Sequence, residues 1–448
     1  MVIIETEKEF QRLQRNIEAQ ESIWIPVFSD SFKHYCNNRI SFIYIYLIDD
    51  KTDYIISFNH KDCLNWKSER LQQLKTNHNI YVLNKKSFSY FYPYTILDID
   101  LLNWFQHNET LKLEDCDTEV HESFNRWYYN VPWINDLIPI TRHYERCRLI
   151  CDLAKETISD SIVDQSFEEY NALVIDNLAA IERNGLRIDY DRFVEKLSAN
   201  NIERQTAYTE YNIYTNTGRP SNRFGGVNYG ALKKEDGSRE AFISRFERGM
   251  LVEFDYDSYH VRIISELIGH DLPSDSLHEW LGRQYFNTPF LTNEQYEESK
   301  QITFRQLYGG VERQYEHIEF FQAIKSFINK LWIQYQTQGY IQTPIFGRKI
   351  FRKWFTDMNA NKLFNYYLQA TETEQNIIIL NNVTELLQNK QSKLILYTYD
   401  SFLFDFDLAD GKDLLLKLKD MLQHDKFPVK IKAGKNYHSM KDMTNKTS

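Results

Sequence analysis

The first part of the chain alternates short apolar runs with polar segments. From about Ser22 to His107, five runs rich in Ile, Tyr, Phe and Trp stand between polar stretches: IWIPVF, ISFIYIYLI, YIISFN, NIYVL and YTILDIDLLNWF. β-branched and aromatic residues in runs of this length are typical of strands. The pattern predicts an α/β domain.

The next segments have apolar residues at helical spacing. This spacing is seen in ITRHYERCRLICDLAKE and in a longer block from Tyr170 to Tyr214, which is broken at Asn184 and Gly185. Because glycine is common just after a helix end, Gly185 is expected to be a helix C-cap. A stretch rich in turn formers, TNTGRPSNRFGGVNYG, then leads into the C-terminal half.

The C-terminal half reads as a strand (GMLVEFDY), long helices, the hairpin LILYTYDSFLFDF and a last strand around PVKIKAG. The polar tail after Met440 is expected to fray. In the helix ESKQITFRQLYGG, Lys300, Phe304 and Tyr308 recur at four-residue spacing, which places them on one face. For an isolated helix such a stripe more often faces a core, with the lysine snorkelling; the alternative is a face that binds nucleotides.

Composition narrows the class of protein. The 448 residues suggest roughly two to four domains. The net charge of -10 argues against a surface wholly devoted to nucleic acid and leaves room for a local basic groove. The odd number of cysteines, 5, without a CxxC pair, favours reduced and buried thiols, including Cys147 and Cys151. There is no apolar run of about 20 residues and no signal peptide, so we expect a soluble cytoplasmic protein without membrane partners.

Two acidic positions flank the Lys300 helix in the sequence. Asp255 ends the apolar run LVEF, and Asp400 lies at the turn of the predicted hairpin. Either one alone would be interpreted as a turn aspartate. Joining nucleotides requires two divalent ions held by carboxylates from separate segments, and a lysine can neutralise the triphosphate. Phe304 and Tyr308 would then stack against the incoming nucleotide and the template base.

The order of these residues resembles the family A DNA polymerases. The first family motif matches Asp255, Tyr256 and Arg262, and the second matches Lys300, Phe304, Tyr308 and Gly309. At the third, where the family has His-Asp-Glu, the chain has Tyr399, Asp400 and Ser401. Weaker similarities are Thr217-Gly218-Arg219, the segment GYIQTPIFGRKI with Arg348, Asn365 with Gln369, and Gly434, Asn436 and Tyr437. The resemblance is strong from Thr217 to Tyr437 and faint before it.

The resemblance implies an α+β multidomain protein: an RNase H-like α/β domain, then a right-hand polymerase with a short thumb, an antiparallel palm sheet and helical fingers. The expected boundaries are 1–152 for the exonuclease-like domain, 153–215 for the thumb and 216–448 for palm and fingers, with the fingers at about 272–335. The implied activity is primer extension with dNTPs on a DNA template, with release of pyrophosphate. Two Mg²⁺ ions would serve as cofactors, with Mn²⁺ as a substitute.

Residue roles carry over by position. The implied catalytic residues are Asp255, Asp400 and Lys300, and the implied metal ligands are Asp255, Tyr256 and Asp400. Nucleotide binding falls to Tyr256, His260, His278, Lys300, Phe304 and Tyr308. Contacts with primer-template DNA fall to Arg219, Arg262, Arg348, Asn365, Gln369 and Tyr399.

The chain departs from the family pattern near these residues. Tyr296 stands where an arginine usually contacts the triphosphate, so nucleotide binding is expected to be weaker unless Arg305 or His278 compensates. His260 replaces the glutamate that acts as the steric gate against ribonucleotides, and an imidazole is large enough to fill that space. Ser401 replaces the third-motif glutamate, which removes one charge.

The N-terminal domain lacks the acids of a proofreading exonuclease. Asp30 stands alone where an Asp-x-Glu pair is expected, Lys85 and Lys86 follow NIYVLN, and Arg148 takes a further acidic place. One carboxylate cannot hold two metal ions, so a structural domain without proofreading is expected. The thumb stretch is short, which predicts low processivity unless a processivity factor or another replication protein clamps the DNA. This trimmed architecture favours a phage-encoded enzyme working in the host cytoplasm.

Two alternatives stay open. A single-subunit RNA polymerase is one, because Asp400-Ser401-Phe402 also resembles that group's Asp-Ser-Phe. Phe304, the Thr-Gly-Arg loop and the exonuclease-like domain argue against it. The other is a non-catalytic protein that binds primer-template. Retention of two mutually repelling carboxylates together with Lys300 argues against that reading.

Overall fold

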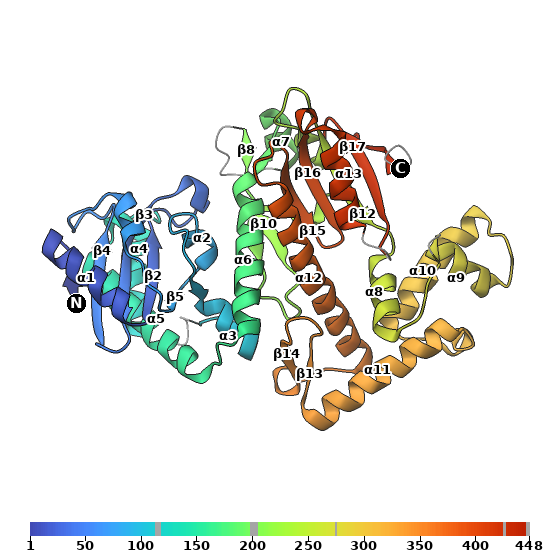
Figure 1. The fold of residues 1–448 in the computed structure, drawn as a ribbon, viewed down its shortest axis with the longest axis horizontal. Helices are drawn as coiled ribbons and strands as arrows, with labels where there is room; N and C mark the ends of the chain where they lie inside the picture. The colour runs from blue at the N-terminus through green and yellow to red at the C-terminus, as the bar shows by residue number, and fades with distance from the viewer. Residues whose placement is uncertain (113–117, 198–204, 274–275, 424–426, 445–448) are drawn as a thin grey trace. The chain divides into compact units, whose positions relative to one another are not determined.

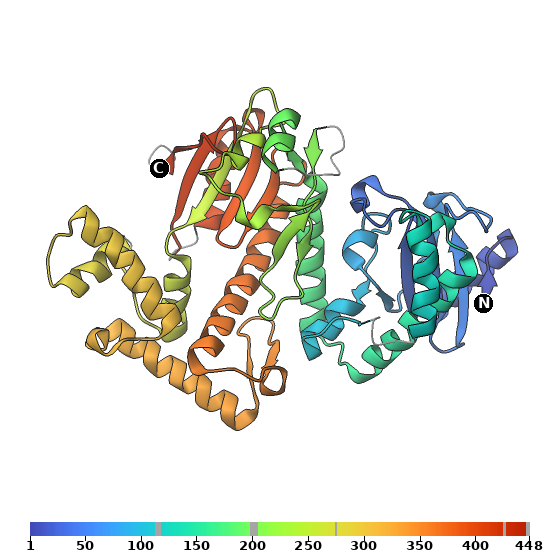
Figure 2. The same cartoon turned by 180° about the vertical axis from the view of Figure 1, so that it is seen from behind.

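The chain divides into two compact units, Met1–Ala179 and Ala180–Ser448. The structure is a computed structural model, and it describes residues 1–112, 118–197, 205–273, 276–423 and 427–444. Figures 1 and 2 show the ribbon from two opposite sides. Among the described residues, no helix is both long enough and apolar enough to cross a membrane.

The first unit is built on a six-stranded sheet with the order β1-β4-β3-β2-β5-β6. Its strands are β1 (Val2–Ile3), β2 (Ser22–Phe28), β3 (Ile40–Leu47), β4 (Thr52–Ser57), β5 (Ile80–Val82) and β6 (Leu97–Asp98). β2, β3 and β4 pair antiparallel, whereas β5 and β6 run parallel to β2. The predicted α/β character of this region is therefore confirmed.

Helices cover this sheet. α1 (Glu7–Ala19) starts with a capping box between Thr6 and Glu9 and buries Phe10 with the core residue Trp24. α5 (Ile140–Asp160) contacts β2 and β3, and its His143 ring lies 4.9 Å from the Phe42 ring. The remaining helices of the unit include α2 (Lys85–Phe88), α3 (Ile99–His107), α4 (Thr118–Asn130) and most of α6 (Gln165–Asn184).

Two of the predicted segments differ in the structure. The run YTILDIDLLNWF is a strand only at Leu97–Asp98 and continues as α3, because the Asp98 carboxylate accepts from the Leu101 amide and caps a helix there. The block from Tyr170 to Tyr214 is helical in α6 and α7 (Tyr190–Leu197), but its later part forms the short strands β8 (Thr206–Ala207) and β9 (Tyr211–Asn212). Gly185, with φ +57°, directly follows α6, as predicted.

The second unit is centred on a five-stranded antiparallel sheet with the order β15-β16-β12-β17-β18. Its strands are β12 (Gly249–Tyr256), β15 (Lys393–Thr398), β16 (Ser401–Asp407), β17 (Val429–Gly434) and β18 (Lys441–Asp442). The tail after Met440 was expected to fray, but β18 pairs with β17 there. Smaller strands are β7 (Leu186–Arg187), β10 (Ser221–Phe224), β11 (Val227–Asn228), β13 (Tyr340–Gln342) and β14 (Lys349–Phe351).

One long helix connects the parts of this unit. α12 (Ala360–Leu386) contacts α8 (Tyr259–Ile268), α10 (Asn293–Gly309), α11 (Glu319–Gln338) and α13 (Gly411–Leu422). α9 (Leu277–Phe286) packs on α10. In Figure 1, α12 descends from the sheet toward α11, and α9 and α10 project together from α8. Helices thus extend from one end of a strand-rich core.

Candidate active site

The two predicted catalytic aspartates come together at one end of the central sheet. β12 and β16 are adjacent, and Asp255 is the register partner of Ser401. The Tyr256 amide donates to the Asp400 carbonyl at 3.0 Å, which ties the end of β12 to the hairpin turn. Residues 145 positions apart in sequence, the difference between 400 and 255, therefore share one edge.

The hairpin turn that carries Asp400 is strained and is held from behind. Tyr399 has φ 61°, a left-handed conformation that costs a non-glycine residue free energy. Its carbonyl accepts from the Asn376 side chain at 2.7 Å, and Asn376 also accepts from the Tyr259 hydroxyl. The Arg219 guanidinium lies 3.8 Å from the centre of the Tyr399 ring. The turn is fixed from two sides.

Charge is concentrated at this edge. Burial first, and then the neighbouring charges of Asp255 and Glu372, raise the pKa of Asp400 to about 6. Burial likewise raises the pKa of Asp255, which Lys432 opposes from 3.5 Å away. Lys430 is paired with Asp257, not with Asp255. Two like charges close together in a buried site cost free energy unless cations neutralise them.

This cost predicts that Asp400→Asn stabilises the protein. The folded pKa of about 6 lies above the ordinary value of 3.8, so the native state carries the penalty above pH 6 and loses it as Asp400 takes up a proton at lower pH. We expect a gain of about 1–3 kcal/mol in the free energy of unfolding at alkaline pH, vanishing below about pH 4. Urea unfolding across this range measures it. An equal gain at every pH would contradict this origin.

The predicted Lys-Phe-Tyr stripe faces outward from α10. The Lys300 ammonium lies 2.7 Å from Glu297 and 4.3 Å from the centre of the Tyr296 ring. Phe304 is 43% exposed, and its ring stacks on Tyr308 with an interplanar angle of 3°. The other side of the helix is buried through Ile302, Thr303, Gln306 and Leu307. The core-facing alternative is excluded for Phe304, and the stripe presents a cation and two aromatic rings.

The C-terminal end of α10 is attached to α12 and α8. Asn365 on α12 donates to the Tyr308 carbonyl at 3.2 Å. The Tyr308 hydroxyl also hydrogen-bonds to His260 Nδ1 on α8. The charge of Asp400 is one of the causes that raise the pKa of Tyr308, after burial, so the two residues lie within electrostatic range of each other.

His278 lies behind the same stripe. Its ring centroid is 5.7 Å from that of Phe304, and its Nε2 is 3.2 Å from the Ser258 hydroxyl. Burial lowers its pKa, while Asp257 and Lys300 act on it through their charges. Burial thus favours the neutral form of this imidazole, and its predicted phosphate contact stays a prediction.

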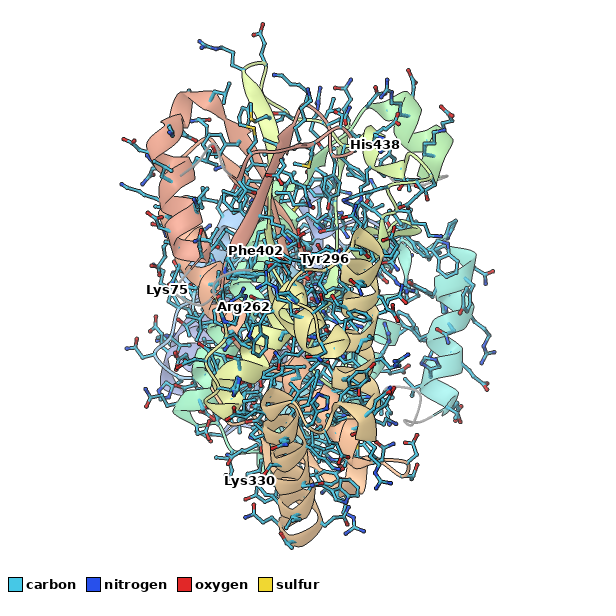
Figure 3. All side chains as sticks on the ribbon, turned by 90° about the vertical axis from the view of Figure 1, so that its right-hand side faces the viewer. Lys75, Arg262, Tyr296, Lys330, Phe402 and His438 are labelled. Atoms are coloured by element: carbon cyan, nitrogen blue, oxygen red, sulfur yellow. The ribbon has the colours of Figure 1, made fainter. Side chains whose placement is uncertain are left out.

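The predicted DNA-contacting residues fall into two groups. Thr217 donates to the Gln369 side chain at 3.3 Å, and Arg219 pairs with Glu372, so the Thr-Gly-Arg loop lies against α12. Arg262 and Arg348 are 4% and 3% exposed. Arg262 donates to the Asp257 carbonyl and Arg348 to the Asn216 carbonyl. Figure 3 labels Arg262 on α8 and Tyr296 on α10. A DNA contact by these two arginines requires their exposure and stays a prediction.

Sequence reasoning missed two polar residues of α12. Glu372 and Asn376 follow Asn365 and Gln369 at intervals of three or four residues, which places all four on one helical face. Glu372 and Asn376 are both buried. The signal was present as a continuation of the Asn-x-x-x-Gln spacing, but glutamate and asparagine in a helix are ordinarily solvent-facing.

The donor set at the edge that carries Asp255 and Asp400 suits a hard divalent cation. Asp255 and Asp400 offer carboxylate oxygens, and the cost of bringing them together is what a bound cation would relieve. In the parts of the chain that the structure describes, no three His, Cys, Asp or Glu side chains gather as a metal cluster. The residues fit a cation whose remaining ligands come from backbone, water or substrate.

In the first unit, the positions at which the sequence analysis looked for acidic residues make structural contacts. Asp30 accepts from the amides of Phe32 and Lys33 and so closes its own turn. The amide of Asn135 donates to the Ser29 carbonyl, which brings the segment before α5 across the end of β2.

A buried lysine stands after β5. The Lys85 ammonium donates to the Asn171 carbonyl at 3.0 Å and pairs with Asp176, both on α6. Burial lowers its pKa. Arg148 lies over the Tyr144 ring at 5.9 Å. Both cations are engaged by protein groups.

Comparison with known structures identifies the fold. It is that of the POL domain of a DNA polymerase. One solved structure that shares it is the POL domain of Pol1 from M. smegmatis, in complex with DNA primer-template and dNTP. The match covers 98% of this chain and 100% of that one, with a TM-score of 0.72 and 13% sequence identity. No protein-family model matches the chain, and no curated protein matches its sequence.

Proposed function

We propose that this chain is a template-directed DNA polymerase of family A type, which adds dNTPs to a primer 3′ end and releases pyrophosphate. One observation carries the proposal. Asp255, at the end of β12, and Asp400, in the turn between β15 and β16, converge in a unit whose α10 carries the half-exposed Lys300 and the exposed Phe304, and this combination supports a cation site beside a nucleotide-binding helix. The shared POL-domain fold is consistent with this combination.

The proposed chemistry assigns one task to each group. Asp255, Asp400 and the Tyr256 carbonyl would hold Mg²⁺ ions, with Mn²⁺ as a substitute. Bound there, the ions would supply charge neutralisation at the primer hydroxyl and the triphosphate. Lys300 would neutralise the charge that develops on the leaving pyrophosphate. Phe304 would stack near the incoming nucleotide.

The remaining proposed contacts surround this centre. His260 would lie under the sugar, and Tyr308 would pack against the template base. The DNA would be contacted by Arg219, Asn365, Gln369 and Tyr399, with Arg262 and Arg348 behind that surface.

We propose that the first unit is an RNase H-like domain without proofreading activity. Its antiparallel β4-β3-β2 strands followed by parallel β5 and β6 are consistent with that fold class. Asp30 is occupied by its own turn, and Lys85 is paired with α6. The same sequence arguments support a short thumb between this domain and the palm, and a phage origin.

This assignment predicts that the protein does not remove a mismatched primer end. A 5′-labelled primer with a 3′ mismatch, incubated with Mg²⁺ and without dNTPs, should keep its length, because one carboxylate cannot hold two ions. A matched primer serves as the control. Shortening of the mismatched primer by single nucleotides would contradict the assignment if an Asp30→Ala variant no longer shortened the primer.

The choice of nucleotide separates the proposal from an RNA polymerase. We expect dNTP incorporation that depends on a primer. Parallel reactions with dNTPs and NTPs, each with and without primer, test this directly. Primer-independent synthesis from NTPs would assign the chain to the single-subunit RNA polymerase class instead.

A further inference from the structure

A buried carboxylate lies between two of the proposed substrate-contacting side chains. Glu372 on α12 is 1% exposed. Its Oε2 lies 3.0 Å from Arg219 Nε and 3.1 Å from His260 Nε2, and its Oε1 accepts from Arg219 Nη2 at 3.3 Å. Burying a carboxylate without such partners would cost free energy, so these contacts offset the cost of burying Glu372.

The His260 ring has a polar neighbour at each of its nitrogens. Nδ1 hydrogen-bonds to the Tyr308 hydroxyl, and Nε2 lies 3.1 Å from Glu372 Oε2, a close charge contact that is not aligned as a hydrogen bond. Burial raises the pKa of Tyr308 to about 12, so this hydroxyl keeps its proton and can donate. A carboxylate only accepts, and a neutral imidazole carries one N–H. With Nδ1 accepting from Tyr308, the hydrogen of the neutral imidazole is on Nε2, where the negative charge of Glu372 at 3.1 Å favours it.

We propose that Glu372 is a positioning residue for sugar selection: it fixes the orientation and the Nε2–H tautomer of the His260 imidazole under the incoming nucleotide. This inference rests on the proposed polymerase function. Without Glu372 the ring loses the charge contact at Nε2 and can turn away from the space that a ribose 2′-hydroxyl would occupy. Ribonucleotides would then enter more easily, with little change for deoxynucleotides.

The contact with Arg219 gives the competing explanation. A carboxylate that served Arg219 alone would stabilise the loop next to Tyr399, over whose ring that guanidinium lies. Its removal would weaken DNA binding, or slow both nucleotide types equally. It would leave the ratio between them unchanged.

The test compares Glu372→Gln, which keeps the size and removes the charge, with wild type. We expect the ratio of kcat/KM for dNTP to that for the matching NTP to fall by about tenfold, in the range by which such pockets discriminate small groups. In a His260→Ala background, Glu372→Gln should change the ratio less than about twofold, because the residue acts through the imidazole. An unchanged ratio in the single variant overturns the inference.

A second measurement needs no Glu372 variant and no activity. The ¹⁵N chemical shifts of the His260 ring, assigned by comparison with His260→Ala, report its tautomer at mildly alkaline pH. The inference requires the Nε2–H form in the wild-type protein. An Nδ1–H form or a rapidly exchanging mixture overturns it. Because this measurement uses wild type, it decides the question even if Glu372→Gln does not fold. If the wild-type protein incorporated neither dNTPs nor NTPs, the proposed function would be refuted. The ¹⁵N measurement of the His260 tautomer would still show whether Glu372 orients the ring.

Discussion

Asp400→Ala should abolish primer extension while leaving DNA binding intact. The carboxylate lies at the turn of the hairpin beside Asp255, and removing it takes away one of the two proposed carboxylate ligands of the cations. Losing several kcal/mol of charge stabilisation in the transition state corresponds to a rate decrease of about 10³-fold or more. Single-turnover extension measures the rate, and fluorescence anisotropy with labelled primer-template measures the affinity.

Neighbouring aspartates provide the matched comparison. Asp255→Ala should be as inactive as Asp400→Ala, because the two groups act as one unit. Asp257→Ala removes an aspartate two positions away that is paired with Lys430, and it should keep extension within about fivefold of wild type, as expected for a partly exposed ion pair. An inactive Asp257 variant beside an active Asp255 variant would show that the wrong carboxylate has been assigned.

Lys300→Ala should decrease kcat/KM for dNTP by about 10²–10³-fold, the range for removing one preorganised group that stabilises developing charge. The ammonium is on the exposed stripe of α10 and its only described ion pair is with Glu297 on the same helix, so it is available to bind a triphosphate. Steady-state kinetics with a fixed primer-template measures the effect.

The control for this substitution is Lys330→Ala, an exposed lysine on α11. It should leave kcat/KM within about twofold, as surface changes away from a site usually do. Lys300→Arg keeps the charge in a larger group and should recover part of the activity. If both lysine-to-alanine variants lose activity equally, the effect is one of general charge and not of the α10 stripe.

The strands that carry the site were predictable from the sequence. The apolar run before Asp255 and the alternating pattern around Asp400 each indicate a strand with a defined end, and the four-residue spacing of Lys300 and Phe304 indicates a shared helical face. These signals are local, so they can be recognised in the sequence without knowledge of the fold.

Other features were not predictable from the apolar pattern alone. The run ending in DLLNWF is apolar enough for a strand or a helix, and Asp98, which caps α3 with one carboxylate oxygen and accepts from the Lys85 amide with the other, decides for α3. The burial of Arg262 follows from its contact with a carbonyl on the preceding loop. The task of Glu372 appears only when α12 brings it between Arg219 and His260, residues more than a hundred positions earlier in sequence.

The most direct test of the account is single-nucleotide primer extension by wild-type protein with Mg²⁺, on templates that differ only in the first unpaired base. The account predicts that each template selects its complementary dNTP, and that omitting the divalent cation stops the reaction. Stable binding of primer-template without incorporation of any dNTP, in Mg²⁺ or Mn²⁺, would contradict it and would favour a non-catalytic DNA-binding protein.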